Sequence, residues 1–163
     1  MIYLTGMMGS GKSQLGSAAA RILNLPFYST DDMAERRAGM TISEIFEAYG
    51  EERFRDIESE VLKSVSLLPF GIVSTGGGII LRERNRLIMA ETGKTLWLHR
   101  DIADTAATLD TTGRPLLKNG RDALFPIYEA RLPLYRMADM EFTGGTAEAL
   151  AEAIKILIKK SGL

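Results

Sequence analysis

GMMGSGKS, residues 6–13, matches the phosphate-binding pattern G-x-x-x-x-G-K-[ST] at every position. A short apolar run at residues 1–5 precedes the motif and predicts a strand, and the run at residues 12–23 predicts an amphipathic helix. Such glycines let the backbone aim consecutive N–H groups at phosphate oxygens, while the positive end of the following helix faces the anion. The alternative is a glycine-rich turn that matches by chance, but strand, loop and helix stand in the order that phosphate binding requires.

Two side chains of this loop carry most of its predicted chemistry. We expect Lys12 to reach the β- and γ-phosphates of ATP and the Ser13 hydroxyl to ligate Mg²⁺. The loop alone would fit a kinase, an ATPase or a GTPase. The guanine-reading string N-K-x-D does not occur, and 163 residues leave little room for a motor ATPase, so a small-molecule kinase is favoured. The other expected nucleotide contacts are Gly9, Ser10, Gly11 and Gln14.

The rest of the chain alternates short β-rich runs with longer helical ones, which predicts βαβ units around a parallel sheet in one α/β domain, residues 1–163. Thr41 and Glu44 form a capping-box pair at one predicted helix start. Further strands are expected at residues 26–28, 71–74, 95–99 and 140–143. Further helices are expected at residues 31–38, 42–49, 51–67, 101–109, 120–136 and 147–160, with Pro126 and Pro133 marking bends.

Composition narrows the class of protein. A net charge of −1 argues against a general nucleic-acid binder, and the absence of cysteine excludes disulfides and thiolate metal sites. One histidine makes a histidine-built zinc site a poor expectation. No run of about 20 apolar residues and no leader pattern occurs, so we expect a cytoplasmic protein without a membrane partner, acting as a monomer.

Candidate acceptor residues follow the predicted second and third strands. Asp31 comes directly after the second strand, where open α/β sheets bind ligands, and would orient or deprotonate an acceptor hydroxyl. The alternative is that Asp31 or Asp32 simply caps the next helix. Three glycines, Gly76, Gly77 and Gly78, follow the third strand and would let a ligand lie against the backbone, unless they form only a flexible turn.

Two arginines and one loop complete the candidates. Arg55 and Arg131 have the planar fork that suits a carboxylate, although an arginine on a helix is more often a solvated surface charge. Residues 110–122 (DTTGRPLLKNGRD) combine glycines, a proline and three basic residues, Arg114, Lys118 and Arg121. This segment is either a plain connection or a mobile lid.

The strings S-T-D, F-R-x-I-E, T-G-G-G, R-P-L-L and R-x-P-L-Y follow the phosphate loop in this order, and together they resemble the shikimate kinase family over nearly the whole chain. The loop alone is shared with many kinases, whereas F-R-x-I-E, the triple glycine and R-P-L-L at these spacings are far more specific. The resemblance implies a three-layer P-loop kinase fold like that of the nucleoside monophosphate kinases, with a five-stranded parallel sheet of order 2-3-1-4-5, flanking helices and a lid.

The resemblance also implies roles for individual residues. Arg55 and Arg131 would take the carboxylate of shikimate, and Asp31 would contact its ring hydroxyls and orient the attacking one. Glu58 would pair with Arg55 and fix its orientation. Arg114 would be the lid arginine that reaches the phosphates and offsets transition-state charge. The acceptor site, at about residues 31–60, would also use Gly77 and Gly78.

The chain departs from the family at three places that concern the nucleotide. Ser29 stands where the family usually has an aspartate that helps to hold Mg²⁺, which predicts weaker metal binding unless Asp32 compensates. The family's adenine-stacking arginine falls near Ala107, where the sequence has no cation. The usual basic, proline-containing loop near the last strand is an uncharged stretch, residues 143–146. Adenine recognition would then depend on backbone contacts.

Three functions remain in competition at this level. The first is transfer of the ATP γ-phosphate to the 3-hydroxyl of shikimate, as in the biosynthesis of aromatic amino acids. The second is a related sugar-acid kinase of the gluconate type, which should lack the arginine pair Arg55 and Arg131. The third is a nucleotide-binding regulatory homologue with impaired catalysis, for which Ser29 and the uncharged adenine loop are the support.

Overall fold

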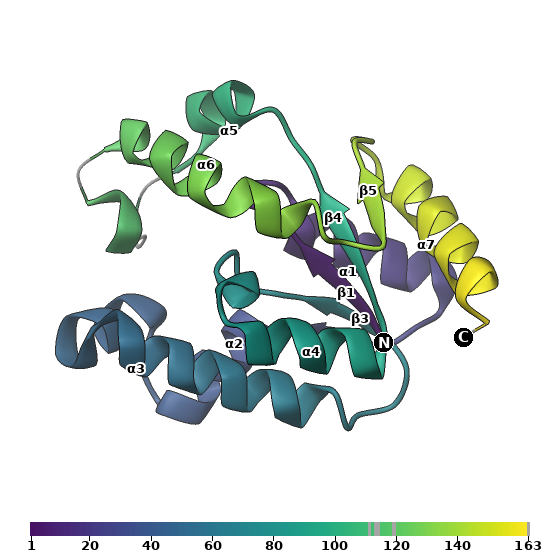
Figure 1. Cartoon of the computed structure of the whole chain (residues 1–163), viewed down its shortest axis with the longest axis horizontal. Coiled ribbons are helices and arrows are strands. Elements are labelled where there is room, and N and C mark those ends of the chain that lie inside the picture. Colours follow the sequence, from purple (N-terminus) through teal and green to yellow (C-terminus); the bar gives the residue numbers. More distant parts are fainter. Residues whose placement is uncertain (111, 113–114, 119, 163) are drawn as a thin grey trace.

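A computed structural model describes residues 1–110, 112, 115–118 and 120–162. At its centre lies a five-stranded sheet in the order β2-β3-β1-β4-β5, and all its strand pairs are parallel (Figure 1). Register places Ile2 of β1 beside Ile72 of β3 and Lys94 of β4. The predicted α/β class and strand order are therefore confirmed. The strands are β1 (Ile2–Thr5), β2 (Phe27–Ser29), β3 (Ile72–Ser74), β4 (Lys94–Leu98) and β5 (Met140–Phe142).

Helices cover both faces of this sheet (Figure 1). The α-helices are α1 (Lys12–Leu23), α2 (Thr30–Ala38), α3 (Ile42–Val65), α4 (Glu83–Thr92), α5 (Ile102–Thr108), α6 (Leu124–Tyr135) and α7 (Ala147–Ser161). Short 3₁₀ turns, η1, η2 and η3, occupy Ile79–Leu81, Pro115–Leu117 and Arg121–Ala123.

Successive side chains of a strand point to opposite faces of the sheet, so the main core has two parts. Ile2 and Leu4 of β1 point to one face, where they pack with residues of α1 and α7 such as Ala19 and Leu150. Tyr3 points to the other face, which α3, α4 and α6 cover. A third, smaller core joins α2 to α3 and consists of Ala34, Ile45, Phe54, Ile57 and Val61.

The pair α2 and α3 shows how local sequence sets this region. The Thr41 hydroxyl accepts from the Glu44 amide while the Glu44 carboxylate accepts from the Thr41 amide, so the predicted capping box is confirmed. The helices predicted at residues 42–49 and 51–67 form one element, α3, which departs from helical geometry at Gly50 (φ 80°, ψ 174°). This break makes Glu51 the first residue of the second helical segment.

Sequence patterning missed one helix and misplaced part of another. No element was predicted for residues 83–92, where α4 lies, because that segment has almost no apolar stripe and buries only Asn85 and Met89. The helix predicted at residues 120–136 is η3 followed by α6. Pro133 lies inside α6 and Pro126 in its first turn, where no intrahelical N–H bond is lost.

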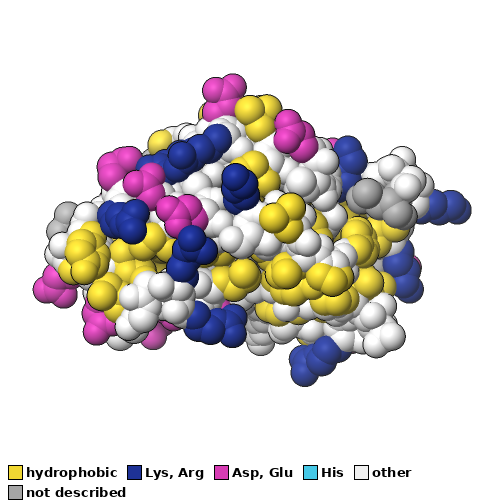
Figure 2. Space-filling view, turned by 90° about the horizontal axis from the view of Figure 1, so that it is seen from below, with side chains coloured by type: hydrophobic (Ala, Val, Ile, Leu, Met, Phe, Trp, Pro, Cys, Tyr) yellow, Lys and Arg dark blue, Asp and Glu magenta, His cyan; other side chains and the backbone are white. Residues whose placement is uncertain are grey.

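The face seen from below the view of Figure 1 mixes charged and apolar side chains. Figure 2 shows basic and acidic side chains interspersed on the left, the side on which α3 lies, and a band of apolar side chains across the same face. The ion pairs of α3 include Arg82–Asp56 at 2.7 Å and Arg37–Glu60 at 2.9 Å. Within the described residues, no helix has the length and apolar character to cross a membrane.

Candidate active site

The phosphate loop joins β1 to α1 and holds its lysine inward. Lys12 Nζ donates to the carbonyls of Gly6 at 2.8 Å and Met7 at 2.7 Å, and its side chain is buried. Gly11 caps α1 with φ 90°, a conformation that a residue with a Cβ adopts only with strain. Ser10 is buried, whereas Gln14 is exposed on the first turn of α1. The loop therefore adopts the predicted strand–loop–helix arrangement, with an ammonium fixed against its carbonyls.

Hydroxyl groups of α1 and β3 meet beside this loop, and a third lies on the neighbouring strand β2. The Ser13 and Ser74 hydroxyl oxygens are 3.0 Å apart, and Ser74, at the end of β3, is paired in register with Ser29 of β2. The Ser29 hydroxyl accepts from the Asp32 amide at 3.2 Å and so caps α2. The alternative that Asp31 or Asp32 caps this helix is therefore wrong, and Asp31 turns into the adjacent cavity.

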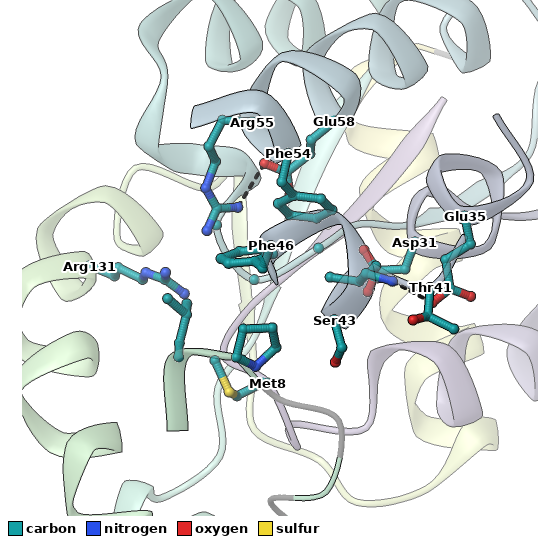
Figure 3. Close-up of a pocket in the computed structure, with 16 residues that line it drawn as sticks. Met8, Asp31, Glu35, Thr41, Ser43, Phe46, Phe54, Arg55, Glu58 and Arg131 are labelled. Carbon is teal, nitrogen blue, oxygen red and sulfur yellow. Dashed lines mark hydrogen bonds and ion pairs between the residues drawn. The ribbon is translucent and has the colours of Figure 1, made fainter. Parts of the chain in front are cut away.

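A cavity of about 460 Å³ lies next to the loop, between α2, α3, the glycine run and α6. Figure 3 shows Arg55 and Arg131 on one side of it and Asp31 and Glu35 on the other. The structure thus brings together Asp31, Arg55, Glu58, the three glycines and Arg131, which the sequence marked as candidates. The remaining wall consists of Met8, Glu35, Thr41, Ile42, Ser43, Phe46, Phe54, Pro115 and Leu116.

Arg55 is fixed by two carboxylates of its own helix. Its Nη1 donates to Glu58 Oε2 at 2.9 Å, and its Nε and Nη2 donate to Glu51 Oε1 at 3.2 and 2.9 Å. Arg55 is 5% exposed and Arg131 is 4% exposed, so neither is the solvated surface charge that isolated helix arginines usually are. The predicted Arg55–Glu58 pair is confirmed.

The glycine run after β3 packs closely against these side chains, and two of its three positions leave no room for a Cβ atom. A Cβ on Gly76 would stand 2.5 Å from Glu58 Oε1 and 2.8 Å from Asp31 Oδ1. A Cβ on Gly78 would overlap the Arg55 guanidinium, and one on Gly77 would stand 3.5 Å from Arg131 Nη1. The Tyr135 hydroxyl donates to the Gly77 carbonyl at 2.6 Å and holds the run in place. The reading of these residues as only a flexible turn is therefore wrong.

Alanine substitution along this run should have graded effects. We expect Gly78→Ala to displace the Arg55 guanidinium and to lower the free energy of unfolding by about 1–3 kcal/mol, as overpacking does. Gly77→Ala should lower the free energy of unfolding less, because the added Cβ would stand 3.3 Å from its nearest neighbours, the Gly6 carbonyl oxygen and the Met8 amide nitrogen. Urea titration of both variants measures the difference. Equal stability losses would contradict this description of the glycine run.

Burial sets the protonation chemistry of the cavity. It raises the pKa of Asp31, against the opposing charge of Lys12, and it raises the pKa of Glu58, against the opposing charge of Arg55. Burial also raises the pKa of Tyr135 to about 12, so this phenol stays neutral and remains a donor to Gly77. Glu58 Oε1 has no hydrogen-bond partner among the described residues, and it faces Gly76 beside Asp31.

A second cavity, of about 350 Å³, opens on the other side of the loop. Arg100 lines it and donates to the Thr108 hydroxyl at 3.3 Å and the Gly9 carbonyl at 3.4 Å. Arg121 donates to the Ala107 carbonyl at 2.9 Å, so two arginines approach the stretch at residues 107–108 where the sequence itself has no cation. The other lining residues are Ser10, Leu98, His99, Asp101, Asp104, Phe142, Thr143, Gly144 and Gly145.

Some site residues escaped sequence reasoning, and one predicted residue lies outside the described chain. Phe46 and Phe54 form an aromatic pair, with ring centroids 5.0 Å apart, on the cavity wall, but at helical spacing they read as ordinary core. Arg100 had no motif around it. The predicted lid arginine, Arg114, falls among the residues that the structure does not describe. Among those it does describe, no group of three or more acidic or histidine side chains is placed to hold a metal ion.

Comparison with known proteins places this geometry in a family. A family model described as "Shikimate kinase" matches residues 8–160. A shikimate kinase of Dictyoglomus turgidum is 42% identical over 139 residues, which cover 82% of this chain and 81% of that protein. One of Cereibacter sphaeroides is 40% identical over 159 residues, covering 94% of this chain and 80% of that protein.

The three-dimensional likeness agrees with these matches. The structure of shikimate kinase from Acinetobacter baumannii in complex with shikimate superimposes with a TM-score of 0.90 at 34% identity. The alignment covers 99% of this chain and 94% of that one. The family model spans the glycine run and both cavity arginines, together with the phosphate loop from residue 8 onward. The chain belongs to the shikimate kinase family.

Proposed function

We propose that this chain is a shikimate kinase, which transfers the γ-phosphate of ATP to the 3-hydroxyl of shikimate. The observation that carries the proposal is the pair of buried arginines, Arg55 and Arg131, in one cavity with Asp31 and beside the phosphate loop. Two guanidinium groups suit a carboxylate, and a carboxylate across the cavity suits a hydroxyl. A gluconate-type kinase would not be expected to carry this arginine pair.

The transfer would follow from how these groups lie. The acceptor hydroxyl oxygen attacks the γ-phosphorus, the bond from that phosphorus to the β,γ-bridging oxygen breaks, and ADP leaves with the bonding electrons. The hydroxyl proton passes to the Asp31 carboxylate, which needs its charged form for this step. Its buried setting raises the pKa of Asp31 toward the range of an effective base. Lys12 would offset the charge that develops on the phosphoryl oxygens.

The nucleotide would occupy the loop and the second cavity. We assign the phosphates to Gly9, Ser10, Gly11, Lys12, Ser13 and Gln14. Arg100 borders the second cavity, and its guanidinium is the cation we place next to the adenine there. Arg114 remains the proposed lid arginine, within a lid at about residues 110–122. The small core of α2 and α3 supports an acceptor-binding unit at about residues 31–60 within one domain.

Mg²⁺ fits this site as a partner of the nucleotide. The Ser13 hydroxyl oxygen is a hard ligand. The neighbouring Ser74 hydroxyl oxygen, 3.0 Å away, can accept a hydrogen bond from Ser13 while the Ser13 oxygen faces the ion. When bound, the ion would neutralise phosphate charge during transfer. We propose that the enzyme acts in the cytoplasm, where ATP is supplied. We also propose that it acts as a monomer, because residues of a single chain line the acceptor cavity.

Ser29→Asp should increase the metal affinity of the resting protein. Asparagine and aspartate cap helices about as well as serine, so Ser29→Asp and Ser29→Asn both keep the cap on α2 and differ in one charge. We expect Ser29→Asp to bind Mn²⁺ at least about tenfold more tightly than Ser29→Asn, as an added carboxylate does. Electron paramagnetic resonance of free Mn²⁺ measures this. Equal affinities would show that residue 29 lies away from the ion.

A coupled assay of ADP release tests the proposed function. It would supply ATP and Mg²⁺ with shikimate, quinate or gluconate in turn. We expect turnover with shikimate and little or none with gluconate. Turnover with gluconate but not shikimate would establish the sugar-acid kinase instead, and absence of turnover with all three would support a regulatory homologue.

A further inference from the structure

We propose that Glu51 is a built-in competitor of the acceptor carboxylate, because its own carboxylate occupies the donor edge of Arg55. This inference rests on the proposed function. Glu51 Oε1 accepts from both Nε and Nη2 of Arg55, at 3.2 and 2.9 Å. That edge presents two parallel N–H groups in one plane and is one of the two edges that a guanidinium offers to a carboxylate; Glu58 already takes Nη1 of the other.

The two glutamates that hold Arg55 differ in burial, which separates their roles. The Glu58 side chain is 2% exposed and holds Nη1 from the protein interior, so it anchors the guanidinium permanently. The Glu51 side chain is 44% exposed and approaches from solvent. Only the glutamate end of this pair is open to water, and a carboxylate that water can solvate is exchanged more readily than a buried one. Arg55 therefore stays in position when Glu51 leaves.

The backbone at Glu51 favours such an exchange. Gly50, directly before it, has φ 80° and ψ 174°, so Glu51 begins the second helical segment of α3 rather than lying within a continuous helix. Residues in a first turn lack intrahelical N–H bonds and open more easily than those of the interior. By contrast, Arg131 has no ion pair with Asp or Glu in the part of the chain that the structure describes. Competition is thus confined to one of the two arginines.

Two consequences follow for the acceptor. A carboxylate that displaces Glu51 gains the Nε–Nη2 edge of Arg55 but must overcome the glutamate already there, so acceptor affinity is set below what the arginine pair would give alone. Neutral ligands cannot make this exchange and leave Glu51 in place. Glu51 therefore narrows the preference of the site for charged acceptors over neutral analogues, and it hastens release of the product after transfer.

The test compares Glu51→Gln with a matched neighbour, Glu52→Gln. Glu52 carries the same charge on the same turn, but its side chain is 90% exposed and pairs with Arg82 instead of Arg55. Calorimetric titration with shikimate, without nucleotide, should show binding about three- to tenfold tighter for Glu51→Gln and unchanged within about twofold for Glu52→Gln. Titration with the methyl ester of shikimate should give the same affinity for Glu51→Gln and the wild-type chain.

Each alternative result has a definite meaning. Weaker or unchanged shikimate binding by Glu51→Gln would overturn the inference and make Glu51 a support that orders Arg55. Equal tightening by Glu52→Gln, or equal tightening for the ester, would also overturn it, because the effect would then be one of general charge or packing. Failure of the wild-type chain itself to bind shikimate would overturn the proposed function and the inference together.

Discussion

Replacing Asp31 by asparagine is expected to lower kcat for shikimate phosphorylation by about 10²–10⁴-fold, the usual contribution of a general base. Asparagine keeps the size of the side chain and its ability to accept a hydrogen bond, so KM for shikimate should change far less. Steady-state kinetics at saturating ATP measure the two constants separately. A kcat within a few-fold of wild type would mean that positioning by other groups suffices and that Asp31 takes no proton.

The same substitution is expected to stabilise the protein at neutral pH. Burial raises the pKa of Asp31 above its ordinary value near 4. Between that ordinary value and the raised pKa, the folded state therefore holds a proton that the unfolded state has already released. Stability is therefore lost as pH rises from that ordinary value through the raised pKa. Asp31→Asn removes this penalty above the raised pKa and has no such effect below about pH 4. Thermal unfolding at pH 7 and at pH 4 measures both; an unchanged or lower Tm at pH 7 would contradict the argument.

Replacing Arg131 by methionine should raise KM for shikimate by about 10²–10³-fold, because loss of one partner of a buried charge pair costs about 2–5 kcal/mol. KM for ATP should stay within about threefold. Arg131 is a cleaner target than Arg55, whose removal would leave the buried Glu58 carboxylate without its cation. Methionine retains most of the volume of the arginine side chain. The Tm of the Arg131→Met variant shows whether it still folds.

The methyl ester of shikimate serves as the control ligand for this prediction. If Arg131 holds the carboxylate, the ester should bind the wild-type chain weakly. Its affinity for the Arg131→Met variant should then be only slightly lower. Equal losses for shikimate and its ester would mean that Arg131 contacts another part of the acceptor. A parallel rise in KM for ATP would place Arg131 with the nucleotide instead.

Local signals predicted the sheet and the phosphate loop well. The strand before Gly6, the glycines and the helix after Lys12 each follow from sequence over a few residues, and apolar runs such as residues 71–74 mark strands buried on both faces. The cap on α3 followed from Thr41 and Glu44 alone. By contrast, α4 has little amphipathic pattern, because it makes contact with the core mainly through Met89.

The acceptor cavity depended on contacts that no local pattern contains. Local reasoning left Arg55 as a surface charge, yet packing of α3 against the glycine run buries it. Only the family resemblance singled out Arg55 and Arg131, and only the fold shows that Gly76 and Gly78 leave space for Glu58 and Arg55. Arg100 could not be found from sequence, since its guanidinium reaches the loop across 91 residues of chain.

The central claim is that the cavity between Asp31 and the two arginines directs phosphate to one hydroxyl of shikimate. The most direct measurement is ³¹P–¹H correlation NMR of the product formed from ATP, Mg²⁺ and shikimate by the wild-type chain. We expect one phosphate ester, with its phosphorus coupled to the proton on carbon 3 of the ring. Phosphorus on another ring hydroxyl, or release of inorganic phosphate without an ester, would contradict the proposed site.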